Sequence, residues 1–78
     1  MNSDNDFEFT IINLLNKIEE GISYNKSLYI HSITYYFKQE DWDYIDKIIE
    51  RLKKNGYNDI TRHSNDGEHI IVKWEYCN

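Results

Sequence analysis

The densest group of side chains that could do chemistry is a run of carboxylates in the middle of the chain. Five carboxylates and one lysine lie between positions 40 and 50; the carboxylates are Glu40, Asp41, Asp43, Asp46 and Glu50. General acid–base catalysis would need paired carboxylates in a pocket that shifts their pKa values. Here Asp43 precedes Lys47 by four residues, and Glu50 precedes Lys54 by four residues. Because this spacing supports an exposed helix, we predict a charged surface and not an enzyme active site.

Two interpretations of this acidic run remain open. It is either a solvated helix face with charges favourable to the helix dipole, or a surface that presents phosphate-like charge to a basic groove on another protein. In the second case an aromatic residue within the run, Tyr44, would anchor the contact, because exposed charges alone contribute little affinity. The predicted partner-binding residues are Glu40, Asp41, Asp43, Tyr44, Asp46 and Glu50.

The three histidines raise the question of a metal site. A turn at Asn65–Gly67 would place His63 opposite His69 across a hairpin, and two imidazoles can hold Zn²⁺ or Cu²⁺. Structural zinc sites use four ligands, and a third ligand near the pair is not evident. We therefore predict two surface histidines, no metal and no cofactor, with His31 half-buried or at an interface.

Several classes of function are disfavoured by motif and charge. The sequence contains no phosphate-binding glycine loop, no nucleophile elbow and no HExxH motif. Its formal net charge of −5 disfavours direct binding to nucleic acid, which depends on neutralising phosphates. We predict a protein that is not an enzyme and does not bind nucleic acid directly.

Length and local composition predict one cytoplasmic domain. A chain of 78 residues has room for one hydrophobic core, so residues 1–78 form a single domain, with 1–6 expected to be flexible. No apolar run approaches the roughly 20 residues that span a bilayer, and the acidic N-terminus is unlike a signal peptide. The single cysteine, Cys77, fits a reducing compartment. We expect no membrane partner.

Two helices are expected to position the acidic run. The segment Glu40–Tyr57 has an apolar stripe at steps of three and four, and Gly56 supplies a left-handed stop. An earlier stripe that begins at Phe7 predicts a helix that ends at Gly21, followed by a loop over Ser23–Lys26. The residues expected to be buried together are Leu15, Ile18, Trp42, Ile45, Ile49, Leu52, Val72 and Trp74.

Three strands are expected to complete the fold. Their predicted ranges are Ser27–Phe37, Tyr57–Ser64 and His69–Tyr76, chosen from β-branched and aromatic content and from the turn at Asn65–Gly67. The third strand is the most apolar and belongs in the centre of the sheet. The predicted class is α+β with element order α-β-α-β-β: a mainly antiparallel three-stranded sheet of order 1-3-2, with both helices on one face.

Both faces of the first predicted strand carry apolar residues, so one of them has no helix to cover it. If the helices cover the face with Tyr29, Ile33, Tyr35 and Phe37, the opposite face presents Leu28, Ile30 and Tyr36 together with Ile71. If they cover the other face, aromatic residues are exposed instead. Contiguous exposed apolar surface usually marks an interface. We predict self-association through Leu28, Ile30, Tyr36 and Ile71, as a homodimer or with an obligate partner, on the open sheet face or the edge of the first strand.

The run from Asp41 to Trp74 resembles a type common among small phage and prophage proteins. In that type a helix ends in Gly-Tyr or Gly-Phe, as at Gly56-Tyr57, and a β-hairpin closes on an aromatic residue near the C-terminus, as at Trp74. The resemblance implies a compact α+β fold and a phage or mobile-element setting in a bacterial cytoplasm. Small acidic phage proteins include inhibitors of host enzymes and defence systems, anti-CRISPR proteins among them.

Two hypotheses of function follow from these observations. The first is a non-enzymatic, anti-CRISPR-like inhibitor or modulator that blocks a host nucleic-acid-handling enzyme or CRISPR effector through the acidic surface. The second is a small structural or assembly protein whose main interaction is homo-oligomerisation. They differ in the surface that must be intact, which is the acidic run in the first and the uncovered apolar surface in the second.

Overall fold

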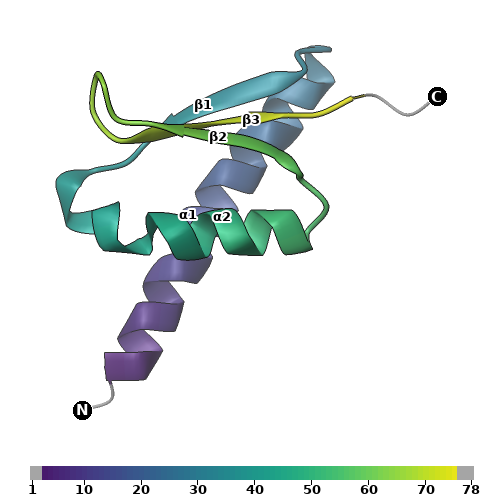
Figure 1. The fold of residues 1–78 in the computed structure, drawn as a ribbon. Helices are drawn as coiled ribbons and strands as arrows, with labels where there is room; N and C mark the ends of the chain where they lie inside the picture. Colours follow the sequence, from purple (N-terminus) through teal and green to yellow (C-terminus); the bar gives the residue numbers. More distant parts are fainter. Residues whose placement is uncertain (1–2, 76–78) are drawn as a thin grey trace.

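The computed structural model describes the backbone of residues 3–75 and the side chains from Asp6 onward. Along the chain lie α1 (Ser3–Ser27), β1 (Ser32–Tyr36), the 3₁₀ helix η1 (Gln39–Tyr44), α2 (Ile45–Lys54), β2 (Asp59–His63) and β3 (His69–Lys73). The strands form one antiparallel sheet of order β1-β3-β2 (Figure 1). The predicted α+β class and strand order are therefore confirmed.

The first helix is longer at both ends than the sequence pattern predicts. It begins at Ser3, inside the segment expected to be flexible, and it continues past Gly21 to Ser27. The predicted stop at Gly21 and the loop over Ser23–Lys26 are therefore wrong. Gly21 has a packing role instead, because a Cβ built there would overlap the Cδ1 atom of Ile33 in β1.

Both long helices end in the same backbone motif. In α1 the N–H of Ile30 donates to the Asn25 carbonyl and that of Tyr29 to the Lys26 carbonyl, with Tyr29 left-handed at φ 61°. This is a Schellman ending with tyrosine in the position that glycine usually takes. The predicted ending of α2 is confirmed, since Gly56 has φ 102° and the N–H of Tyr57 donates to the Leu52 carbonyl.

All three strands are shorter than predicted. Leu28 and Ile30 belong to the ending of α1, so β1 begins only at Ser32. Tyr57 closes α2, so β2 begins at Asp59. The regular part of β3 ends at Lys73, and Tyr76, which was predicted to end this strand, lies outside the described residues.

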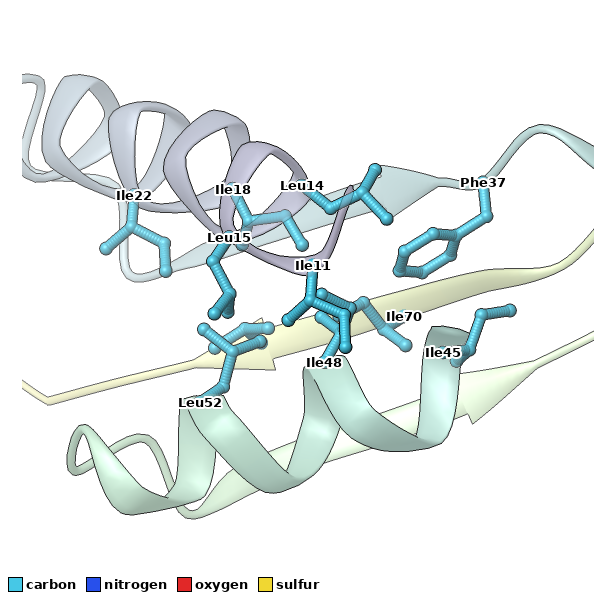
Figure 2. Packing of buried hydrophobic residues seen from close by; sticks show 11 residues of the cluster. Ile11, Leu14, Leu15, Ile18, Ile22, Phe37, Ile45, Ile48, Leu52 and Ile70 are labelled. Carbon is cyan, nitrogen blue, oxygen red and sulfur yellow. The ribbon is translucent and has the colours of Figure 1, made fainter. Parts of the chain in front are cut away.

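The core lies between the two helices and one face of the sheet. Figure 2 shows side chains from α1, α2 and the sheet converging in one cluster. The buried apolar residues are Ile11, Leu14, Leu15, Ile18, Ile22, Phe37, Ile45, Ile48, Leu52, Ile70 and Val72. Because this cluster joins both helices to the Ile70 and Val72 side of β3, the opposite sheet face is left without a helix.

Three predicted core positions are corrected. In α2 the residue with no exposed surface is Ile48, whereas Ile49 is only partly buried. The buried stripe of α2 is therefore shifted toward Ile48, while Ile45 and Leu52 are buried as predicted. Trp42 is 40% exposed, because residues 39–44 form η1 and not the first turns of α2. Trp74 packs on the margin of the core and is partly buried.

Candidate functional site

The acidic surface, defined as Glu40, Asp41, Asp43, Asp46 and Glu50, lies on η1 and α2. All five residues lie outside the buried core, and four of them are exposed, with Asp41 partly buried. Asp43, Asp46 and Glu50 follow one another at steps of three and four, so they share one helical stripe. Ile45, Ile48 and Leu52 occupy the opposite side of α2 and are fully buried. The amphipathic pattern that builds the core thus turns these carboxylates toward solvent.

Two of the five carboxylates have cationic partners. An Asp46 oxygen accepts from Arg62 of β2 at 2.9 Å, and the same guanidinium reaches Glu68 at 3.0 Å. Glu50 lies 3.7 Å from Lys47. Lys47 is thus paired with Glu50, three residues away, and not in the expected i, i+4 pair with Asp43. Ion pairs this exposed contribute about 0–1 kcal/mol, so Arg62 mainly fixes where Asp46 points.

Of the two aromatic residues in η1, Trp42 is the more exposed. Tyr44, which the sequence suggested as an anchor for a partner, is partly buried and packs against the core, and its ring centroid lies 5.2 Å from that of Phe7. Tyr44 therefore holds η1 against α1. Trp42 is more exposed, and its indole N–H donates to the Phe37 carbonyl at 3.4 Å. In the sequence Trp42 lies between two aspartates, which favours an exposed position. Its match to the helical apolar periodicity led instead to the prediction that it is buried.

The acidic surface acts electrostatically on the adjacent strand. Partial burial, and secondarily the negative charge of Asp41, raise the pKa of the Tyr35 hydroxyl in β1 above its ordinary value. Both causes favour the neutral phenol in the folded protein. Tyr35 also contacts Phe37 edge to face, with the ring centroids 5.0 Å apart. A change in the charge of Tyr35 is therefore coupled to folding.

The raised pKa of Tyr35 predicts a loss of stability in alkali. Stability contributed by a raised tyrosine pKa is present below the unfolded-state value, about 10, and is lost as the pH rises through the folded-state value. We expect the free energy of unfolding of the wild type to fall more steeply above about pH 10 than that of Tyr35→Phe. Urea unfolding of both proteins from pH 8 upward measures this difference. Parallel curves would show that Tyr35 is not coupled to folding.

The residues predicted for self-association do not all lie on the sheet. Tyr36 is 56% exposed on the open sheet face, and Ile71 is half-buried on the same face of the neighbouring strand. Leu28 and Ile30 are 50% and 43% exposed, but they lie in the ending of α1 and not on the sheet. The prediction that all four share a sheet face is therefore wrong, because β1 begins later than expected.

The predicted pairing of His63 with His69 across the hairpin is confirmed. The two residues are register partners, and their rings are stacked with centroids 5.3 Å apart. Tyr36 lies against the other side of His69 at 4.5 Å, which leaves His69 only 7% exposed. The Nδ1 atom of His69 is 2.9 Å from the Gly67 carbonyl. Across the residues that the structure describes, no three potential metal ligands gather, and Cys77 lies outside them.

An open cleft of about 770 Å³ lies between the loop after α2 and the ends of β1 and β3. The Lys26 ammonium lies over two rings that line it, 5.4 Å from the centroid of Tyr57 and 5.8 Å from that of Trp74. Charges of both signs, Asp59 and Lys73 among them, complete the lining. The sequence did not suggest this cleft, because its residues come from three segments that are distant in the sequence. The acidic surface contributes none of its lining.

Comparisons with known proteins add no functional assignment. The chain matches no protein-family model, no curated protein and no solved structure. Among the described residues, no helix has both the length and the apolar character to cross a membrane.

Proposed function

We propose that this protein acts by binding another protein and blocking or modulating a nucleic-acid-handling enzyme through its acidic surface. The observation that carries the proposal is the outward stripe of carboxylates on η1 and α2, directly opposite the buried stripe of α2. A groove that binds nucleic acid is rich in lysine and arginine. Carboxylates spaced along one exposed stripe offer such a groove the charge that phosphates would otherwise supply.

Charge and an exposed aromatic residue have separate roles in this proposal. The net charge of −5 and the carboxylates attract a basic partner and accelerate encounter, an effect that weakens as salt rises. Trp42, in the same turn as Asp41 and Asp43, supplies the apolar contact that gives affinity at the centre of an interface. The resemblance to small phage proteins makes bacterial defence nucleases, CRISPR effectors included, the first partners to test.

The proposal predicts that charge reversal at the η1 end of the acidic surface weakens partner binding. We choose Glu40→Lys with Asp43→Lys, because both residues are exposed and Asp46 is needed to hold Arg62. The double variant should lower affinity for a basic partner about tenfold or more at low salt, and less at high salt. Isothermal titration calorimetry at two salt concentrations, against candidate enzymes recovered with the wild-type protein, measures the effect.

A matched control separates position from net charge. Glu20→Lys with Asp66→Lys reverses two exposed carboxylates away from η1 and α2, so both double variants carry a net charge of −5 + 4 = −1. Circular dichroism checks that each variant is folded. If both variants bind as the wild type does, or if both lose affinity equally, the acidic surface is not the binding site.

A further inference from the structure

The exposed edge of β1 carries a set of unpaired backbone groups. In the sheet, the N–H of Phe37 donates to the Glu68 carbonyl, and the His31 carbonyl accepts from Trp74. Because hydrogen-bonded pairs alternate in an antiparallel ladder, the odd residues 31–37 bond to β3. The even residues Ser32, Thr34 and Tyr36 therefore direct their N–H and C=O groups away from the sheet.

One of these groups already has a partner. The Asn25 side-chain amide at the end of α1 donates to the Ser32 carbonyl at 2.8 Å. Among the described residues, the structure gives no hydrogen bond to the N–H or C=O groups of Thr34 and Tyr36. The four open groups of Thr34 and Tyr36 thus lie next to one another along the second half of β1.

The two edges of the sheet differ in protection. Exposed edges are usually guarded against pairing by charged residues or proline. The other edge strand, β2, carries Asp59 and Arg62, whereas β1 has the sequence SITYY, with no charge. Thr34 and Tyr36 are both exposed. β1 and β2 form the two edges of the sheet (Figure 1). The edge of β1 is therefore open to an additional strand, while charged residues guard the edge of β2.

We propose that β1 pairs with β1 of a second copy of this chain, antiparallel about a two-fold axis at Tyr35. In this register Thr34 of each copy faces Tyr36 of the other. Each such pair exchanges two hydrogen bonds, so the four open groups of each copy are all used and the Asn25–Ser32 bond is kept. A second copy fits because the set is self-complementary under a two-fold axis and no like charges face each other within the paired strands.

The same arrangement also brings exposed apolar residues together. In an antiparallel pair, the start of one strand lies beside the end of the other. The α1 ending with exposed Leu28 precedes β1, and η1 with exposed Trp42 follows it. Pairing therefore directs Leu28 of one copy toward the η1 segment of the other. This extends the interface beyond the five-residue strand.

Hydrogen exchange of backbone amides tests the proposal on the unmodified full chain. As protein concentration rises through the dimerisation range, the Thr34 and Tyr36 amides should become slow to exchange. Ile60 and Arg62 give an internal control, because their amides point outward from the guarded β2 edge and should stay fast. Sedimentation should show a dimer over the same range. A monomer at high micromolar concentration, or a dimer with fast Thr34 and Tyr36 amides, would overturn the proposal.

Two matched substitutions test which edge pairs. Thr34 and Thr61 are both exposed, and they flank Ile71 from opposite edge strands on the same sheet face. Thr34→Lys should raise the dimer dissociation constant about tenfold or more, because it adds a guarding charge in both copies. Thr61→Lys should leave it unchanged. Equal effects of the two substitutions, or no effect of Thr34→Lys in a folded protein, would contradict pairing through β1.

Discussion

Replacing Ile48 with alanine is expected to lower the free energy of unfolding by about 2–5 kcal/mol. Ile48 has no exposed surface and lies where α2 meets α1 and the sheet (Figure 2). The substitution removes buried methyl groups and leaves a cavity among rigid neighbours, and both effects cost stability. Small domains are stable by about 5–15 kcal/mol in total, so this loss is a large fraction. Urea denaturation of wild type and variant measures it.

A second alanine substitution serves as the control. Ile49 has the same side chain in the next position of α2 but is only partly buried. Ile49→Ala should therefore cost clearly less than Ile48→Ala. A larger loss of stability in Ile49→Ala than in Ile48→Ala would mean that α2 turns toward the core the stripe that sequence periodicity predicts, with Ile49 at its centre.

The second large effect is expected at Gly21, where α1 approaches β1. A leucine there should destabilise the protein by about 1–3 kcal/mol, because even a Cβ would overlap the Cδ1 atom of Ile33. Leucine is a good helix former, so a loss of stability would report the steric contact and not helix propensity. Ser23→Leu, at an exposed position two residues further along α1, is the control and should cost little.

A double-mutant cycle isolates the contact at Gly21. Ile33→Val removes the Cδ1 atom, which is the one that would meet a new Cβ. Gly21→Ala should therefore be more favourable in the Ile33→Val background than in the wild type, by about 0.5–3 kcal/mol, the usual interaction energy of residues in contact. The helix advantage of alanine over glycine is the same in both backgrounds and cancels in the cycle. An effect of Gly21→Ala that is the same in both backgrounds would show that Gly21 and Ile33 are not in close contact.

The two proposed surfaces lie on neighbouring elements but use different chemistry. The acidic surface acts through carboxylates of η1 and α2, whereas the edge of β1 acts through backbone groups of an uncharged strand. Reversal of Glu40 and Asp43 changes no backbone group of β1, and Thr34→Lys changes no carboxylate. The Glu40→Lys with Asp43→Lys variant can therefore serve as a control in the dimerisation assay, and Thr34→Lys can serve as a control in the partner-binding assay.

The sequence by itself determined the features that depend on local periodicity and turn chemistry. The stop of α2 at Gly56 follows from a residue that adopts positive φ at no steric cost. The hairpin pairing of His63 with His69 follows from the turn residues between them. The central place of β3 follows from its apolar content, because a central strand is covered by neighbours on both edges.

Only the tertiary structure decided features that depend on how elements pack. The local sequence predicts that Gly21 ends the first helix. In the structure α1 continues past Gly21, and the missing side chain lets the helix approach Ile33 of β1 closely. Tyr29 adopts the left-handed position although its side chain disfavours it, because the chain must turn there to enter β1. The orientation of α2 that buries Ile48, and the start of η1 that exposes Trp42, likewise depend on neighbours distant in sequence. Periodicity identifies an apolar stripe, but only the packed partner determines which of its residues loses all contact with water.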